Sequence, residues 1–592
     1  MSRTPGRLGW TLLWAVVYAH VGASIYYVPG ILRVAVGDQA FVLVLLATAA
    51  LGVLGVKEIE TAGRFPGGGG AVSLVERAFG RWWGCLVAQV LTVNFFLAVA
   101  MAVTSAVQQI VVIAPIASPT AAALGCLAVL GVLNVVGLKV GRWVSLGLTG
   151  AALLVALLLV GLGVAWALGG GARPAEVWAS AGVGVPALGG VGVAWLAVGG
   201  IQSFSLLAPA MRDLGGTPRR TMRAVLVAVL LTAPALTFLT AAHLPDGVGE
   251  SALVTRLALL VGGTALAAAV ALTGAGLLLF GANAAIVSGY HVSGALTARG
   301  LLPVGLGELS ARFQTPSRAI ALGVAVPAAL VLAVGAEPER LAGIYASGVL
   351  GAAALGGVAL DLLRWRERDR GLRFWLGAAV SVAAVAGLLA LGWSRPVDVA
   401  VGAGMTVVGM LVAWATDSGW FVRALQRLPG FRLPQVVDGA DVPFCTVSQA
   451  RLRVSAGDPP GVLVASRGGS PKLYSEAIER ARSRSAAKVF VLYVDEVPGL
   501  FYPELVSPTA EGLTVLESGC AMIRAGGLEP VPVWAISHSA AGSVAQTAEV
   551  CACDTVVIGA TQRTFLWHAL RGRFIQQLLK QLPPEIRLIV VG

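Results

Sequence analysis

The sequence predicts an all-α membrane protein with about twelve transmembrane helices, followed by a doubly wound α/β domain at the C-terminus. The 592 residues are 57% hydrophobic and only 12% charged, whereas soluble domains carry about 25% charged residues. A chain of this length with so few charges cannot cover its surface with polar groups in water, so it needs lipid as its solvent. After about residue 420 the apolar runs shorten and charges appear throughout.

The first 420 residues hold twelve apolar runs long enough to cross a bilayer, which takes about 20 helical residues. Val, Leu, Ala and Gly dominate them, and Gly allows the close helix contacts that stabilise membrane bundles. The eighth run is long enough to extend past the bilayer as a tilted helix. The runs lie at about 9–34, 39–63, 83–112, 119–137, 143–168, 188–211, 222–243, 253–294, 318–336, 340–363, 372–393 and 396–416.

The basic residues alternate between the two sides of these runs. Connections after even-numbered runs hold clusters of bases, such as Lys57 with Arg64, 212–223 and 364–373, whereas odd-numbered connections hold few. Because basic loops remain in the cytoplasm, we expect a multi-pass protein of the inner (cytoplasmic) membrane with both termini inside. The net charge of +12 has the same explanation, so we expect no nucleic-acid partner. The short basic N-terminus shows no cleavable signal.

Two runs, five helices apart, are interrupted by small and polar residues. The first contains Gly22-Ala23-Ser24 and then Pro29-Gly30, and the sixth contains 198–204 with two adjacent glycines. A matching pair of broken helices indicates a central binding site in an inverted-repeat transporter. Half-helix ends there offer N–H groups to an anion and carbonyls to a cation. The alternative is that these glycines only let helices pack closely.

Three segments carry a resemblance to a known family. Residues 22–26 stand where that family has an unwound G-x-G-I-F segment, and 58–71 resemble its "YAELATRFPxxGGAY" signature. Residues 281–303 resemble its eighth-helix "NA…ARDGLLP" pattern, followed by 315–319. In this order the motifs make residues 9–420 similar to the amino acid–polyamine–organocation (APC) superfamily. The resemblance implies a LeuT-type 5+5 inverted repeat and a secondary active transporter for an amino acid or related small amine.

The resemblance also implies the substrate-binding residues. The substrate carboxylate meets first-helix amides, the amine meets sixth-helix carbonyls, and Tyr26 or Phe204 is the candidate aromatic gate, with ordinary packing as the alternative. Gln202 stands where the family has an acidic residue. The expected substrate-binding residues are Gly22, Ala23, Ser24, Tyr26, Thr92, Gly199, Gly200, Ile201, Gln202 and Phe204.

His20 is the one clearly ionisable residue deep in a span, which makes it the candidate for coupling to H⁺. A neutral histidine bonded between helices is the alternative. The layout also resembles a potassium importer of the KUP-like branch, gated by its cytosolic domain. That branch uses carboxylates in the first and third helices, where His20 and Ala88 stand here with Thr92 retained. A non-transporting membrane sensor is the third hypothesis. No nucleophile–base set or metal cluster points to an enzyme, a cofactor or a metal.

The C-terminal part reads as a linker over 421–455, with Pro-Gly breakers, and an α/β domain over 456–592. The transporter domain accordingly covers 1–420. In this domain short apolar runs alternate with helical segments, which predicts a five-stranded, mostly parallel doubly wound sheet. Strands are expected at 461–466, 488–494, 531–536, 555–559 and 587–591, and helices at 471–486, 509–525, 541–551 and 565–581.

The α/β domain resembles a universal-stress-protein (Usp) domain. In that family the fourth strand leads into G-x2-G-x9-G-[ST], which cradles nucleotide phosphates. Here Gly559 and Gly572 keep their spacing, whereas Gln562 and Arg573 replace the second glycine and the Ser/Thr. A loop with fewer glycines approaches phosphates less closely. These four residues are therefore only candidate nucleotide-binding residues, and a regulatory role or a role in forming a homodimer is favoured over ATP binding. A cyclic dinucleotide is the alternative ligand, because Arg563, Arg571 and Arg573 could face its phosphates, and a basic solvated helix is the other interpretation of these arginines.

Overall fold

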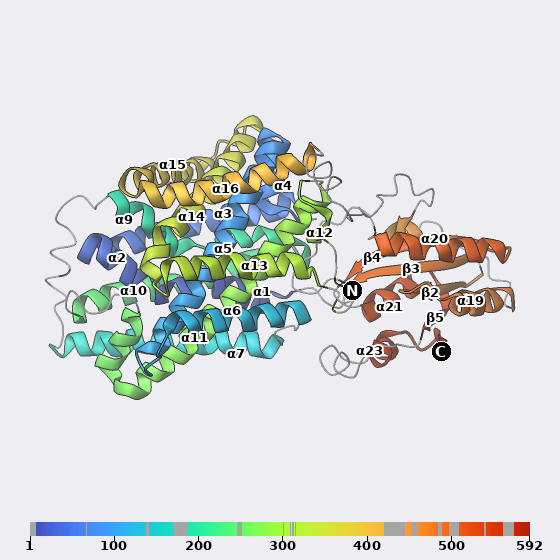
Figure 1. Ribbon diagram of the computed structural model, residues 1–592, viewed down its shortest axis with the longest axis horizontal. Helices are drawn as coiled ribbons and strands as arrows, with labels where there is room; N and C mark the ends of the chain where they lie inside the picture. Colours follow the sequence, from blue (N-terminus) through green and yellow to red (C-terminus); the bar gives the residue numbers. More distant parts are fainter. Residues whose placement is uncertain are drawn as a thin grey trace, which may run out of the picture. The chain divides into compact units, whose positions relative to one another are not determined.

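The computed structural model describes most of the chain as two compact units, one helical and one α/β (Figure 1). Each unit is described by itself. The described residues are 8–66, 68–137, 141–170, 177, 188–244, 252–299, 301–307, 310, 313, 315–418, 444–451, 454, 459–483, 488–496, 508, 510–537, 540–559 and 574–591.

The helical unit begins with a broken helix and contains a second one near its middle. Its described elements are α1 (Trp10–Val21), η1 (Gly22–Tyr26), α2 (Val28–Val36), η2 (Gly37–Gln39), α3 (Ala40–Arg64), α4 (Gly70–Phe79), α5 (Arg81–Val111), α6 (Pro119–Val136), α7 (Arg142–Leu168), α9 (Leu188–Val193), η3 (Ala194–Val198), η4 (Ile201–Ser203), η5 (Ser205–Ala210), α10 (Thr217–His243), α11 (Leu253–Ala298), α12 (Val304–Gly307), α13 (Ser317–Val334), α14 (Pro338–Arg366), α15 (Leu372–Ser394) and α16 (Pro396–Asp417).

Eleven segments among the described residues are long and apolar enough to cross a membrane, close to the expected twelve. The difference lies at the first run. There α1 and η1 form a shorter apolar segment, Trp10–Tyr26, and α2 continues with α3 as the candidate span Val28–Arg64. Gly37, with φ of +57°, separates α2 from α3. The arrangement is that of a multi-pass membrane protein, and the inverted repeat stays a prediction.

The eighth run differs from the single tilted helix that we expected. Within α11 the backbone of Gly263 leaves the helical region, with φ of 69° and ψ of −165°. A short helix therefore precedes a long one across a kink. Hydropathy alone did not reveal the kink because the residues on both sides are equally apolar.

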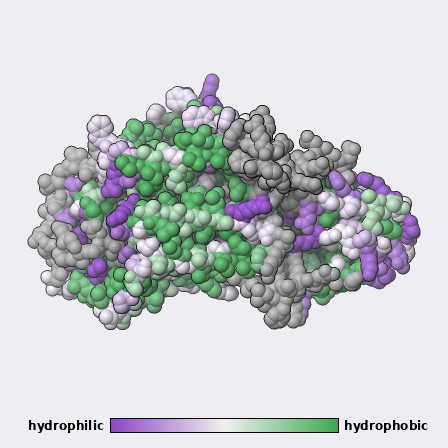
Figure 2. All heavy atoms as spheres, viewed as in Figure 1, coloured by the Kyte–Doolittle hydropathy of each residue, from purple (hydrophilic) through white to green (hydrophobic). Residues whose placement is uncertain are grey.

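Burial separates the interior helices from those that face lipid. Within the most apolar 18-residue window of each span, 78% of α5 and 89% of the broken span Gly189–Ala210 is buried. The corresponding shares are 22% for α6 and 17% for α16. Hydrophobic residues cover most of the described helical surface in the view of Figure 2. The broken span thus lies inside the unit, where its interrupted backbone is shielded from lipid.

The α/β unit is a parallel sheet with helices on both faces (Figure 1). Its strand order is β1-β4-β3-β2-β5-β6, and every recorded pairing is parallel. One core lies under α18, α21 and α23, and the other under α19 and α20. The described elements are β1 (Cys445–Thr446), α18 (Val447–Arg451), β2 (Gly461–Ala465), α19 (Pro471–Ser483), β3 (Lys488–Glu496), α20 (Ala510–Ala525), β4 (Glu529–Ser537), α21 (Ala540–Val550), β5 (Cys553–Gly559), α23 (Phe574–Gln581) and β6 (Arg587–Val591).

The doubly wound fold is confirmed, but the expected count of five strands is wrong. The additional strand is β1, which pairs with β4 and lies within the segment 421–455 that we expected to be a linker. It was missed because two residues give no periodic pattern. Residues 565–573 of the last expected helix lie outside the described residues, and α23 begins at Phe574.

Candidate functional site

The first helix breaks at the predicted place. After Val21 the chain forms the 3-10 turn η1, all of whose residues are buried, and Pro29 in the first turn of α2 has no N–H to donate. The Ser24 hydroxyl donates a hydrogen bond to the carbonyl of Val21 at 2.7 Å. It also lies 3.4 Å from the carbonyl oxygen of Ala197, just before the second break.

The second break is centred on two glycines. Gly199 is extended, with ψ of 143°, and Gly200 has a φ of +86°, which few residues other than glycine adopt. Ser203 donates a hydrogen bond to the carbonyl of Gly200 at 2.7 Å. A Cβ on Gly199 would lie 2.9 Å from the Tyr345 hydroxyl of α14, so that hydroxyl lies directly over the opened backbone.

The second break packs against the last turn of α1, just before the first break. A Cβ on Gly200 would lie 2.9 Å from the Cβ of His20 and 3.2 Å from its carbonyl oxygen. Gly281 of α11 lies equally close on another side of α1, because its Cβ would be 2.7 Å from the carbonyl oxygen of Ala19. Small residues thus bring the two interrupted backbones into one buried centre.

Polar side chains around this centre keep unused hydrogen-bonding atoms. His20 is 8% exposed, and neither of its ring nitrogens has a hydrogen-bond partner among the described residues. Gln202 donates to the carbonyl of Val349 in α14 at 3.3 Å, while its amide oxygen has no described partner. Asn94 of α5 lies against Gly348, and its side-chain oxygen is also without a described partner. Buried polar atoms of this kind call for a water molecule or a ligand.

The other predicted residues are buried, but their side chains are differently engaged. Phe204 and Tyr26 are 0% and 2% exposed, and the Tyr26 ring lies against Gly274 of α11. The Thr92 hydroxyl donates to Ala88 within its own helix at 2.9 Å. The Gly22 backbone packs against the ring of Tyr18. The expected roles of these residues in binding stay predictions, as do those of Ala23 and Ile201.

Supporting contacts hold both breaks from neighbouring helices. Gln109 of α5 donates to the carbonyl of Tyr26 at 3.1 Å and accepts from the hydroxyl of Thr255 at 2.6 Å. A carboxylate oxygen of Glu58 in α3 accepts from the backbone N–H of Ser205 at 3.1 Å, at the start of η5. Sequence reasoning did not assign Gln109, Glu58 or Tyr345 to the site. Polar residues inside apolar runs were the available signal, but they do not say which backbone atom they meet.

In the α/β unit, β2 and β5 are neighbours, and the chain leaves them towards opposite edges of the sheet. Ligands of doubly wound sheets bind beyond the carboxyl ends of such a strand pair. Gly559 is the last residue of β5, at this carboxyl end, and it is exposed. Ser466 directly follows β2, and its hydroxyl accepts a hydrogen bond from the N–H of Gly469 at 3.1 Å. Gln562, Arg563, Arg571, Gly572 and Arg573 lie outside the described residues.

Comparisons with known proteins separate the two parts of the chain. The model of a family described as amino acid permease matches residues 9–415, from the start of α1 into α16. No curated protein matches the chain. Among solved structures, the universal stress protein from Archaeoglobus fulgidus is 18% identical, with a TM-score of 0.19, over 22% of this chain and 98% of its own. A universal stress protein in complex with cAMP is 14% identical, with a TM-score of 0.19, over 23% and 98% of the two chains.

Proposed function

Because the chain belongs to the amino acid permease family, we propose that it is a secondary active transporter that moves an amino acid or related small amine across the cytoplasmic membrane. The observation that carries this proposal is the direct contact between two interrupted helices at Gly200 and His20. Their opened backbones offer amides and carbonyls at one buried place, which suits the two ends of an amino acid.

The described side chains at this centre favour a zwitterion over a bare cation. Gln202 is a neutral amide, and Asn94 and Ser24 are neutral as well, so these groups bring no negative charge to balance a potassium ion. An amino acid carries both charges itself and needs only hydrogen-bonding partners. The Gly22 N–H already bonds to the Tyr18 carbonyl, and the Gly200 carbonyl already accepts two hydrogen bonds from Ser203. We therefore infer that the amides of 23–24 face the carboxylate, and that the carbonyls of Gly199 and Ile201 and the oxygens of Gln202 and Asn94 face the ammonium group.

Proton coupling and cytosolic regulation complete the proposal. His20 is an ionisable group in the last turn of α1, just before the first break, which makes it a candidate for H⁺ coupling. We assign the α/β unit to the cytoplasm as a regulatory domain, in line with the basic even-numbered connections, and a homodimer or a nucleotide are its candidate partners.

The test is uptake into proteoliposomes of a labelled amino-acid panel and of rubidium, with and without a pH gradient. We expect amino-acid exchange without rubidium flux. Ser24→Trp should abolish the exchange by filling the first break. Leu154→Trp on α7, where Leu154 is 69% exposed, is the matched control and should keep it. Rubidium flux alone would favour a potassium importer, and a thermal shift by an amino acid without any flux would favour a sensor. If His20→Gln retains pH-driven accumulation, that residue has no coupling role.

A further inference from the structure

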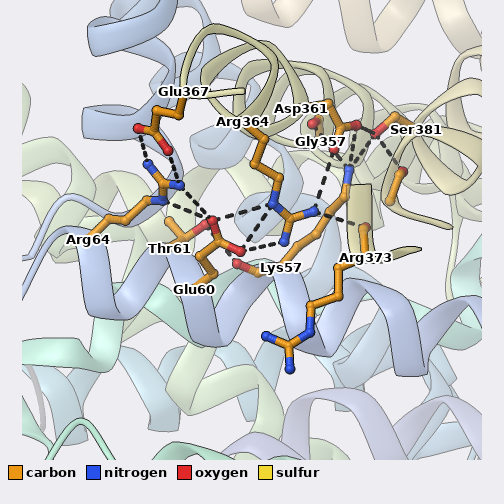
Figure 3. A network of polar contacts seen from close by, with 11 residues as sticks. Lys57, Glu60, Thr61, Arg64, Gly357, Asp361, Arg364, Glu367, Arg373 and Ser381 are labelled. Carbon is orange, nitrogen blue, oxygen red and sulfur yellow. Dashed lines mark hydrogen bonds and ion pairs between the residues drawn. The ribbon is translucent and has the colours of Figure 1, made fainter. Parts of the chain in front are cut away.

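A network of buried charges joins α3, α14 and α15 (Figure 3). Lys57 of α3 is 5% exposed, Asp361 of α14 8% and Arg364 of α14 1%. Lys57 and Arg364 were expected from the sequence to be loop charges, but both lie inside helices and are buried. Ionisable groups buried in membrane spans are costly and mark functional sites by default.

The ammonium group of Lys57 has an oxygen partner for each of its three N–H bonds. Its Nζ donates to a carboxylate oxygen of Asp361 at 2.7 Å, to the Ser381 hydroxyl at 2.6 Å and to the carbonyl of Gly357 at 3.2 Å. Ser381 in turn donates to the same Asp361 oxygen at 2.6 Å. One carboxylate, one hydroxyl and one carbonyl therefore surround the ammonium as they would surround a bound monovalent cation.

Two glycines make room for this arrangement. A Cβ on Gly357 would lie 2.6 Å from the Ser381 hydroxyl, and a Cβ on Gly377 of α15 would lie 2.7 Å from Cε of Lys57 and 3.0 Å from the outer Asp361 oxygen. Ser381 stands nine residues into α15, or about 14 Å along the helix. Lys57 stands seven residues before the end of α3, and Asp361 stands five residues before the end of α14. The ammonium is thus held inside the helix bundle by a site that larger residues would fill.

The remaining charged side chains form a series of ion pairs that runs from this site to the ends of α3 and α14. Arg364 donates to Glu60 of α3 at 3.1 Å, and Arg64 pairs with both Glu60 and the half-exposed Glu367. Arg364 also donates to the carbonyl of Arg373 at 3.1 Å, whereas the side chain of Arg373 points away from the network (Figure 3). Three bases and three acids therefore balance, so the closed contact between α3 and α14 is neutral.

Asp361 is the member of the network with a free position. Its outer oxygen has no hydrogen-bond partner among the described residues, and Arg364 Nη1 lies 3.9 Å from it. If α3 moves away from α14, Lys57 and Glu60 leave together, and Asp361 keeps only the longer pairing with Arg364 of its own helix, 3.9 Å away. Loss of the closest partner destabilises a buried carboxylate, and binding a proton removes its charge.

We propose that Asp361 is a proton-binding residue of the transport cycle and that Lys57 is its tethered cation. With the α3–α14 contact closed, the pair is ionised. When the contact opens, Lys57 keeps its ammonium proton and Asp361 takes one proton from water, becoming a neutral carboxylic acid. When the contact closes, the returning ammonium displaces that proton to water. One proton therefore binds and leaves in each cycle.

This inference rests on the proposed transport function, and two measurements keep them separable. The first is amino-acid exchange at equal pH, compared with accumulation driven by a pH gradient. Asp361→Asn preserves an oxygen acceptor for Lys57 but cannot bind the proton, so we expect exchange within about twofold of wild type and loss of accumulation. Glu337→Gln, which neutralises a half-exposed carboxylate paired with Arg340 outside this network, is the matched control and should keep both activities. Accumulation by Asp361→Asn at the wild-type level would overturn the proposal.

A second variant guards against misfolding of the single substitution. In Lys57→Met/Asp361→Leu both charges are replaced by apolar groups, which is often neutral or stabilising for a buried pair. We expect this protein to fold and to exchange without accumulating, and accumulation by it would equally contradict the proposal.

The second measurement needs no substrate. Hydrogen–deuterium exchange over 57–64 and 361–367, corrected for the intrinsic rate, should increase in wild type as the pH is lowered, because proton binding by Asp361 favours the open contact. Asp361→Asn should show no such change. A wild-type profile independent of pH would overturn the proton-binding role even if transport is confirmed. The expected profile without amino-acid exchange would instead contradict the proposed substrate class.

Discussion

Gly200 in the second broken helix lies directly against His20 in the first, because a Cβ at Gly200 would be 2.9 Å from the His20 Cβ. This position also has a φ of +86°. Two separate physical reasons, close approach and left-handed backbone, therefore require glycine at the point where the two interrupted helices meet.

Gly200→Ala should for this reason impair transport more than folding. The added methyl group meets the His20 backbone, and the strained backbone costs on the order of 1–3 kcal/mol. We expect amino-acid exchange to fall at least tenfold, measured in proteoliposomes. Gly150→Ala on α7 is the matched control, because nothing lies within 4 Å of a Cβ there. Wild-type exchange by Gly200→Ala would show that the two breaks do not need this contact.

Gln109→Leu should lower the stability of the helical unit. The substitution leaves the carbonyl of Tyr26 and the hydroxyl of Thr255 without their partner, at a cost of about 1–3 kcal/mol, and it loosens the first break. A reduced apparent melting temperature in detergent would show this effect. Thr104→Val is the control on the same helix, since Thr104 bonds only to α5 carbonyls. If Gln109→Leu and Thr255→Val have strictly additive effects, the bridge between them is not energetically coupled.

Asp213 should stabilise the start of α10 in a pH-dependent way. The Asp213 carboxylate accepts hydrogen bonds from the Thr217 hydroxyl and from the backbone N–H groups of Gly216 and Thr217. These bonds lower the pKa of Asp213 from 3.8 to about 2. Because the folded pKa is the lower one, the stabilisation is present above about pH 4 and is lost as the pH falls towards about 2. The melting temperatures of wild type and Asp213→Ala should therefore converge on acidification. The difference between Asp213→Asn and Asp213→Ala should not change with pH, because neither side chain titrates. A pH-independent difference between wild type and Asp213→Ala would contradict the prediction.

The buried cysteines of the α/β unit should be unreactive at neutral pH. Burial raises the pKa of the Cys520 thiol to about 11 and that of Cys551 to about 12, so the reactive thiolate is scarce. We expect slow labelling by a thiol reagent in the native protein and fast labelling after denaturation. Since the unfolded thiols ionise near pH 9, the unit should lose stability as the pH rises from about 9 towards 12. Rapid native labelling of Cys520 or Cys551 would contradict their burial.

The local sequence predicted the two breaks well because they depend on residue type. Small residues followed by Pro29-Gly30, and two adjacent glycines beside polar residues, indicate an interrupted helix from residue type alone, so 22–26 and 199–203 were found without tertiary information. The strands β2 to β6 were found for a similar reason, since each is a short apolar run between helical segments. Strand β1 was missed because two residues carry no period, and the kink at Gly263 because a glycine in an apolar helix is usually tolerated.

The sequence by itself determined three properties of this protein. It is a membrane protein, its first and sixth helices break at identifiable residues, and an α/β unit follows the helices. These properties follow from composition and from short-range periodicity. Only the tertiary structure decided that His20 meets Gly200 and that Lys57 meets Asp361, a residue 304 positions away. It also showed that Arg364 is a buried partner of Glu60 rather than a loop charge. Hydropathy records how costly a charge is in a span, but only packing supplies the partner that makes the charge tolerable.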